Sequence, residues 1–322
     1  MRMGALPYPG LALHKVVDPD DLGRHRYNSL FRPFDGEVER GIIYTRHGGF
    51  VDVAHIRDAS DWTQFYAMRA RDAMRRGERE VDAEGPDATR VHLTFTYPND
   101  WNLRTEDDRE RTIGEIAIRA GQEAGYGVSV MHEVLTWHGY SHVFFISEKP
   151  SAFTYDDTVS HLIGLRVAER AWLSDAPTYD QAVEAAIYAE LDELGAYRPE
   201  LTRQAVEIVR GDWWERGHVL VRHFDVGYDD RRVTPMVVPV FSSSGGEPDL
   251  HLPGLIDLVE DDVVVKVELE PTVRLYRDEL AKQLPGSPTR LTPAVHLPML
   301  IDRIREENGE LPSETHASVT PE

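Results

Sequence analysis

Hydrophobic and polar positions along the chain predict a mainly α-helical protein with short flanking β-strands, an α+β arrangement. The most regular helical pattern runs over residues 106–139, where acidic residues open the segment and Gly139 can end it. We therefore expect a helical core around one long central helix. Further helices are expected over residues 53–76, from Thr154 onward, and near residues 178–194 and 198–214.

The segments between these helices predict strands, turns and loops. Residues 41–53 are rich in β-forming side chains but are interrupted by Gly48-Gly49, which predicts a turn at that pair. Alternating apolar and polar residues predict half-buried strands over residues 91–97 and 263–269. The remaining expectations are a loop over residues 77–90, extended chain over residues 219–221 and 237–240, and a flexible connection over residues 242–246.

The composition excludes several kinds of site and partner. The chain has no cysteine, so disulfides, zinc–thiolate sites, iron–sulfur clusters, a cysteine nucleophile and a lipoprotein anchor are excluded. A formal net charge of −21 repels phosphate backbones, so nucleic acid is not expected as a partner. No apolar run approaches the roughly 20 residues of a membrane span, and residues 1–15 make a poor signal peptide because prolines and a glycine break their apolar stretch. We therefore expect a cytoplasmic protein, whose oligomeric state the sequence leaves open.

The first candidate for chemistry is the run from Asp52 to Asp58, where a β-rich segment enters a helix. His55 and Asp58 are three residues apart, so a helix places them on one face. This pairing suits two metal ligands, or a histidine that a carboxylate orients for acid–base work. The alternative is a carboxylate that caps the helix beside a histidine satisfied by hydrogen bonds.

The second candidate is His132-Glu133 inside the long helix. The pair begins like the zinc motif His-Glu-x-x-His, but Thr136 stands where the second histidine would be, so the metalloprotease interpretation fails. Gly121 and Gly125 precede His132 on its face of the helix, and each costs roughly 1 kcal/mol relative to alanine. We expect either a closely packed helix or a ligand near the backbone to compensate. A buried hydrogen-bond network without chemistry is the alternative for the polar groups.

A third cluster contains Asp156, Asp157 and His161. Asp157 and His161 are four residues apart, which suits a surface ion pair or the edge of a metal site. Thr154 followed three residues later by Asp157 resembles a capping box. We therefore favour a capped, solvated helix start as the explanation of these acidic residues.

Two segments resemble the signature of the bacterial family called domain of unknown function 4056. They are residues 41–62, which contain Asp52-Val-Ala-His55-Ile-Arg-Asp58, and residues 131–140, which contain His132-Glu-Val-Leu-Thr136-Trp137. Shorter matches lie at residues 17–27, 152–160 with Gly164, 212–214 and 267–271. The resemblance spans residues 10–275 and implies that the two longer segments build one site. It implies no reaction, because the family name assigns none.

The chain departs from the family pattern in three respects. Many members of the family resemble exported lipoproteins, whereas this chain has no cysteine. His138 stands where the family usually has Tyr or Phe, and His161 stands where Asn is usual. Either histidine could add a ligand or a base to the site that the family pattern implies.

The resemblance and the element pattern together predict the domain organisation. We expect one family domain over residues 10–275, with a helical core over about residues 50–214 and extended segments over residues 215–275. Residues 276–306 are expected to form a C-terminal helical extension. The polar residues 307–322 are expected to be disordered.

Three functions fit these candidates. The first is a metal-dependent hydrolase acting on a small-molecule ester or amide or on a lipid-like substrate, with zinc, iron or manganese as the divalent metal. The second is a metal-free acid–base enzyme of specialised metabolism, such as a cyclase, isomerase or lyase, in which Glu133 or Asp58 would orient His132. The third is a binding protein without catalysis. No nucleotide cofactor is expected, because the chain has no Walker loop and no Gly-x-Gly-x-x-Gly run after a strand.

The candidate residues fall into three roles. The candidate metal ligands are His55, His132, Asp58, Glu133 and Asp52. The candidate catalytic residues are His132, Glu133, Asp58 and Thr136, and the candidate substrate-binding residues are Trp137, His138, Tyr140 and His161. The assignment of one shared site requires the side chains of His55 and His132 to meet in space.

Overall fold

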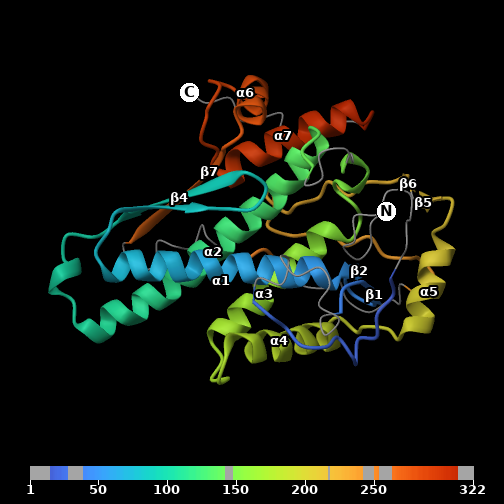
Figure 1. The fold of residues 1–322 in the computed structure, drawn as a ribbon, viewed down its shortest axis with the longest axis horizontal. Helices are drawn as coiled ribbons and strands as arrows, with labels where there is room; N and C mark the ends of the chain where they lie inside the picture. Colours follow the sequence, from blue (N-terminus) through green and yellow to red (C-terminus); the bar gives the residue numbers. More distant parts are fainter. Residues whose placement is uncertain are drawn as a thin grey trace.

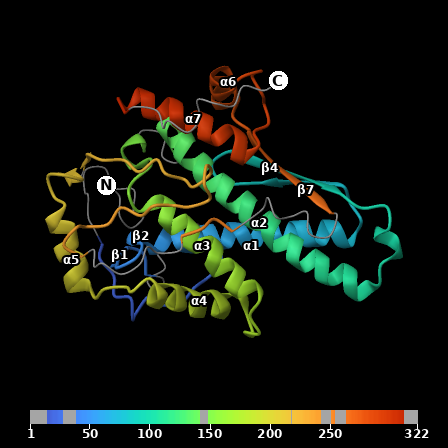
Figure 2. The ribbon, with the colours of Figure 1, turned by 180° about the vertical axis from the view of Figure 1, so that it is seen from behind.

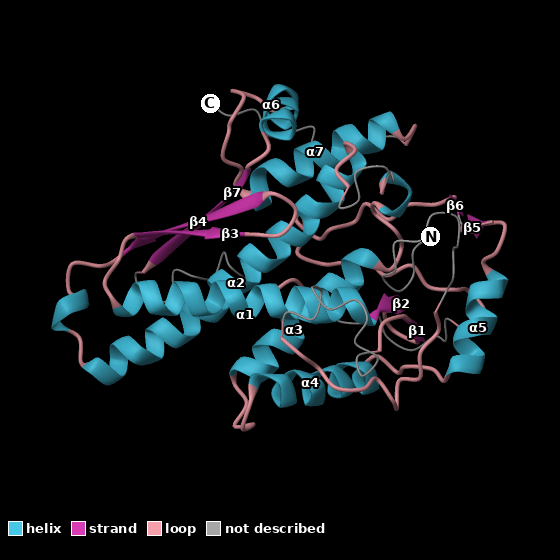
Figure 3. Ribbon diagram, viewed as in Figure 1, coloured by secondary structure: helices cyan, strands magenta, loops and turns pink. Residues whose placement is uncertain are grey.

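The computed structural model describes residues 15–27, 39–141, 148–216, 218–241, 250–253 and 263–310. Helices form most of its regular structure and the strands form small sheets (Figure 3), which confirms the predicted mainly helical α+β class. Among the helices of these described ranges, none combines the length and the apolar character that a membrane span requires.

Helix α2 (Glu106–Trp137) is the long central helix that the sequence predicts. It begins after Thr105, whose side chain accepts a backbone hydrogen bond from the first turn, and three acidic residues occupy that turn. It ends two residues earlier than predicted, and Gly139 follows in the left-handed region with a φ of 94°. The helix runs alongside and across α1 (Val53–Arg75), as Figures 1 and 2 show.

Close approach of helices explains the glycines of α2. A Cβ atom added at Gly121 would lie 2.5 Å from the carbonyl oxygen of Thr63, and one added at Gly125 would lie 2.5 Å from the Thr63 hydroxyl. Gly164 of α3 (Asp157–Trp172) approaches α1 in the same way, because its Cβ would lie 2.6 Å from a carbonyl oxygen of that helix. Of the two explanations for Gly121 and Gly125, close packing between helices is therefore the correct one.

A three-stranded antiparallel sheet packs against both α1 and α2. Its strand order is β3 (Glu80–Glu84), β4 (Thr89–Thr96) and β7 (Val264–Pro271). The predictions for β4 and β7 are confirmed to within two residues, but the predicted loop over residues 77–90 is wrong because it contains β3. The strand is hard to recognise in the sequence because every second residue is acidic and only Ala83 is buried. Both features are typical of a strand at the edge of a sheet.

A buried hairpin leads directly into α1. Its strands are β1 (Ile42–Thr45) and β2 (Gly49–Asp52), and the turn between them confirms the prediction at Gly48-Gly49. Gly49 has a φ of 67°, and a Cβ at this position would lie 2.2 Å from the carbonyl oxygen of Met236. The hairpin ends one residue before α1 begins, so it fixes the start of that helix.

The region after α3 contains two further helices and a small hairpin. Helix α4 (Tyr179–Glu193) is confirmed, whereas α5 (Pro199–Ile208) ends six residues earlier than predicted. The chain turns at Gly211, whose φ is 88°, and then forms β5 (Trp214–Glu215) instead of continuing the helix. β5 pairs with β6 (His218–Val219), while residues 237–240 lie in no strand.

The C-terminal part of the described chain adds two helices beside the sheet. These are α6 (Arg274–Gln283) and α7 (Pro293–Glu307), and α7 packs into the same hydrophobic core as α2 (Figure 1). The domain boundary at residue 275 stays a prediction. Of the tail expected to be disordered, residues 311–322 lie outside the described residues, as does the connection expected over residues 242–246.

Candidate functional site

The first part of the site is the start of α1. Asp52 caps this helix, because its Oδ1 accepts a 2.7 Å hydrogen bond from the backbone N–H of Ala54. Its other carboxylate oxygen lies 3.8 Å from Nδ1 of His55. Asp52 is therefore the capping carboxylate of the alternative interpretation, yet one of its oxygens still faces the histidine.

A serine joins the start of α1 to the start of α3. The backbone N–H of Asp52 donates a 2.8 Å hydrogen bond to Oγ of Ser160, and this hydroxyl donates to the carbonyl oxygen of Asp156. All three residues are buried. Ser160 thus holds together two carboxylates that are more than 100 residues apart in the chain.

Asp52, His55 and Asp156 form a group suited to a metal ion. Each offers one ligand atom, and these three atoms lie within 4.8 Å of one another. Nδ1 of His55 and Oδ2 of Asp156 are shielded from solvent, and neither makes a hydrogen bond to a described residue. Oδ1 of Asp157 lies 3.5 Å from the same histidine nitrogen. Buried polar atoms are ordinarily paired, so these orphaned atoms point to a ligand between them.

The carboxylates of this region repel one another. Burial and the neighbouring Asp52 raise the pKa of Asp156 to about 6, although His55 offsets part of the shift. Burial, Glu133 and Asp156 raise the pKa of Asp157 well above its ordinary value. Four acidic side chains therefore share one buried region, and a bound cation would relieve their repulsion.

His161 connects this group to α2. Its ring centroid lies 5.2 Å from that of His55, and the side chain is buried. Burial lowers its pKa well below the ordinary value, and the nearby His55 and His132 lower it further. His161 is therefore neutral near pH 7, and it lies within electrostatic reach of both predicted histidines.

Helix α2 contributes His132 and Glu133, and each is held by a residue with an unusual backbone. Nδ1 of His132 lies 2.6 Å from Oδ2 of Asp87, and Oε2 of Glu133 accepts a 2.7 Å hydrogen bond from the backbone N–H of Phe153. Asp87 and Phe153 have φ values of 53° and 54°, in the left-handed region that non-glycine residues rarely adopt. Such strain is found preferentially at functional sites, where surrounding structure maintains it.

Asp58, a predicted ligand and catalytic residue, lies outside the group of three. Its pKa is raised well above the ordinary value by burial and by Asp61, and Arg40 lowers it in part. Asp61 in turn contacts Nε2 of His25 at 3.0 Å. Asp58 thus lies within electrostatic reach of the pair of Asp61 and His25, and also of Asp52.

The other predicted residues surround the C-terminal end of α2. Thr136 is buried, and its hydroxyl makes no hydrogen bond to a described residue. Nε1 of Trp137 donates a 2.9 Å hydrogen bond to Glu307. Burial lowers the pKa of His138, while burial and Asp87 raise the pKa of Tyr140 to about 12. Tyr140 therefore lies within electrostatic reach of Asp87, the partner of His132.

Sequence reasoning missed three residues of the site. Asp156 and Asp157 were expected at a solvated helix start, but their side chains are buried, so that interpretation is wrong. Of the expected capping box only one half is present, a 2.6 Å hydrogen bond from the backbone N–H of Thr154 to Asp157. Both aspartates lie in a segment that carries the family resemblance, which was the available signal. No signal in the sequence indicated Asp87, because it lies in a turn 45 residues from His132.

Comparison with known proteins adds one finding. A family described as protein of unknown function (DUF4056) has a model that matches residues 1–237, a range that contains every site residue described above. The match agrees with the resemblance of the two signature segments. No curated protein and no solved structure matches the chain.

Proposed function

The chain belongs to the DUF4056 family of proteins of unknown function, and from the geometry of its site we propose that it is a metal-dependent hydrolase. We propose Asp52, His55 and Asp156 as the ligands of a divalent cation. One observation carries this proposal: Asp52, His55 and Asp156 each offer a ligand atom within 4.8 Å of the other two. Nδ1 of His55 and Oδ2 of Asp156 are buried and make no hydrogen bond to a described residue.

The ligand set favours a borderline or hard cation. Two carboxylates and one imidazole suit zinc, manganese or iron(II). Three protein ligands leave coordination positions for water, and a bound cation lowers the pKa of that water toward neutrality. The repulsion that raises the pKa of Asp156 to about 6 would then be replaced by attraction to the cation.

His132 is proposed as the general base. An ionised Asp87 can only accept a hydrogen bond, so the 2.6 Å contact places the proton of His132 on Nδ1 and leaves Nε2 as an acceptor. Nε2 would take a proton from the attacking water and return it to the leaving alcohol or amine. Asp87 would hold the ring in this tautomer. Glu133 would position the turn at Phe153 by accepting a hydrogen bond from the backbone N–H of Phe153.

The substrate is proposed to be a small-molecule ester or amide, lipid-like esters included. Water attacks the carbonyl carbon, and the bond to the leaving oxygen or nitrogen breaks. A chain with a net charge of −21 disfavours polyanionic substrates. A cytoplasmic location stays a prediction.

Metal analysis of purified, tag-free protein tests the ligand set. We expect about one equivalent of zinc, manganese or iron in the wild-type protein, and loss of the metal in His55→Ala and Asp156→Asn. Asp58→Asn is the matched control, because Asp58 belongs to α1, the helix of His55, but lies outside the group of three. It should retain the metal.

Hydrolysis of p-nitrophenyl esters of graded chain length measures the proposed activity. His132→Ala should retain the metal but lose ester hydrolysis, because His132 lies outside the proposed ligands. A wild-type protein that remains metal-free after reconstitution with each of the three cations would refute the proposal. Retention of metal in Asp156→Asn would refute the assignment of ligands.

A second candidate is the metal-free acid–base enzyme, a cyclase, isomerase or lyase. The pair of Asp87 and His132 favours it, because this pair beside the neutral His161 needs no cation for proton transfer. Activity that survives chelation but is lost in His132→Ala would select this function over the hydrolase.

A further inference from the structure

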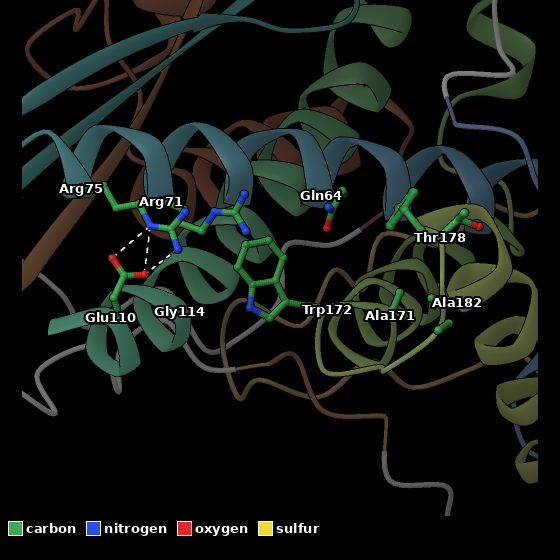
Figure 4. Close-up of a pocket in the computed structure, with 11 residues that line it drawn as sticks. Gln64, Arg71, Arg75, Glu110, Gly114, Ala171, Trp172, Thr178 and Ala182 are labelled. Atoms are coloured by element: carbon green, nitrogen blue, oxygen red, sulfur yellow. Dashed lines mark hydrogen bonds and ion pairs between the residues drawn. The ribbon is translucent and has the colours of Figure 1, made fainter. Parts of the chain in front are cut away.

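A groove lies away from the proposed metal site, along the second half of α1. Helices α1, α2, α3 and α4 all contribute to its lining, and it encloses about 360 Å³. Figure 4 shows Arg75 and Glu110 at one end and Gln64 and Thr178 toward the other. The lining contains no residue of the site described above, so the groove is a separate feature.

The charge of the groove is opposite to that of the protein. Two arginines and one glutamate are the charged side chains among its lining residues, in a chain with a net charge of −21. Arg75 is already paired, because its Nε and Nη2 both donate to the carboxylate of Glu110. Arg71 makes no hydrogen bond to a described residue, and its contact with a carboxylate is the 3.8 Å distance between Nε and Oδ1 of Asp72. The positive charge of the groove is therefore concentrated at Arg71.

Trp172 holds the Arg71 guanidinium in place. The central carbon of this group lies 5.3 Å from the centroid of the indole ring (Figure 4). Stacking on an aromatic face reduces the freedom of the arginine while leaving the edge of its planar group available for hydrogen bonds. A guanidinium held in this way binds a carboxylate or phosphate through two parallel hydrogen bonds.

Gly114 gives the groove an open floor. A Cβ added at this position would meet nothing within 4 Å, whereas Gly121 and Gly125 of the same helix are required by contact with Thr63. Helix packing therefore provides no reason for a glycine at position 114, although glycine is unfavourable inside a helix. Its backbone lines the groove and, without a side chain, permits close approach of a ligand.

We propose that this groove is a binding site for a small organic anion, with a carboxylate or phosphate group bound by Arg71 and the rest of the molecule lying over Gly114. The volume of the groove, about 360 Å³, is at the lower end of the range for small-molecule sites, which limits the ligand to a compact molecule. The site is independent of the proposed hydrolase activity.

Calorimetric titration of the full chain tests the site with two probes, sodium benzoate and inorganic phosphate. Saturable binding of benzoate alone would indicate an organic carboxylate, and saturable binding of phosphate would indicate that the oxyanion is sufficient. Arg71→Gln should weaken binding by roughly tenfold or more. Gly114→Phe should also weaken it, because the ring fills the groove, whereas Gly114→Ala adds only a methyl group and should weaken binding less than Gly114→Phe does.

Arg69→Gln is the matched control. Arg69 belongs to the same helix and lies over the ring of Phe65 at 5.2 Å, but it does not line the groove. The affinity of the Arg69→Gln variant for each probe should equal that of the wild-type protein. The proposal is overturned if neither probe binds at concentrations up to about 10 mM, if Arg69→Gln weakens binding as much as Arg71→Gln does, or if binding survives in Gly114→Phe. Circular dichroism of each variant confirms that it is folded.

Discussion

Nδ1 of His132 lies 2.6 Å from Oδ2 of Asp87, although 45 residues separate them in the chain. The histidine comes from the central helix and the aspartate from the turn between β3 and β4, where two successive residues, Asp87 and Ala88, have left-handed backbones. The turn therefore accepts an unfavourable conformation at the point where it orients the histidine. This relationship leads to the first prediction.

We expect Asp87→Asn to reduce ester hydrolysis by roughly 100-fold or more while leaving the metal content unchanged. An asparagine amide can donate to Nδ1, which would favour the tautomer with its proton on Nε2 and remove the proposed base. The ratio kcat/KM across the p-nitrophenyl ester series measures the effect. The control is Asp82→Asn, since Asp82 contacts Nδ1 of His92 at 2.7 Å in the sheet and away from the site. Equal losses in the two variants would contradict the role assigned to Asp87.

The second prediction concerns the stability contributed by the cation. A ligand that binds only the folded state raises the unfolding temperature, so chelation should lower the melting temperature of the metal-loaded wild-type protein. Asp156→Asn removes a proposed ligand and should show no further decrease on chelation. Thermal unfolding with and without EDTA provides the comparison, and Asp58→Asn should respond as the wild-type protein does. A decrease of the same size in Asp156→Asn would show that the cation binds elsewhere.

The helices of this protein could be predicted from the sequence because their apolar positions repeat with the helical period. The bounds of α1 and α2 differ from expectation by one and two residues. The edge strand β3 could not be recognised in the same way, because a strand that buries one small side chain has almost no hydrophobic pattern. The early end of α5 depends on Trp214, whose Nε1 donates to the carbonyl oxygen of Val206 and thereby joins the next turn to the helix. Such a contact between elements leaves no periodic signal.

The candidate site could be predicted only in part, for a related reason. Spacing along a helix identified His55 and His132 as candidates, and the structure places both within electrostatic reach of His161. Their partners are set by contacts between distant elements: Asp156 is held near Asp52 through Ser160, and Asp87 reaches His132 from a turn. Burial was also decisive for Asp156, because a solvated aspartate and a buried one look the same in a sequence.

The third prediction concerns the pH dependence of stability through Glu123. Burial raises the pKa of this carboxyl from 4.5 to about 7, and Arg231 offsets part of the shift. The folded state therefore holds the proton more tightly than the unfolded state. The stability due to this group is fully present below the unfolded pKa near 4.5 and is lost as the pH rises through about 7.

Glu123→Gln keeps a neutral side chain at every pH, so it should stabilise the protein at pH 8 by roughly 1–3 kcal/mol and have little effect near pH 4.5. Urea unfolding at a series of pH values measures the difference. Glu115→Gln, on the exposed surface of the same helix, serves as the control, and its unfolding midpoints should follow those of the wild-type protein. A constant effect of Glu123→Gln across this range would rule out a titrating carboxyl as its cause.

The fourth prediction compares two glycines of α2. Gly114→Ala should stabilise the protein by roughly 0.5–1 kcal/mol, because alanine is the better helix former and the new methyl group meets nothing within 4 Å. Gly121→Ala should destabilise it by roughly 1–3 kcal/mol, because its Cβ would lie 2.5 Å from a backbone oxygen and 2.8 Å from Cβ of Ala67, so that α1 and α2 must separate.

Chemical denaturation of both variants beside the wild-type protein measures the two changes under one set of conditions. The opposite signs matter more than the magnitudes, since helix propensity alone would stabilise both variants by the same amount. A stabilising effect at Gly121 would mean that α1 and α2 can move apart at little cost. The close contact between these helices, which supports His55 on one and His132 on the other, would then not be what keeps the two halves of the site together.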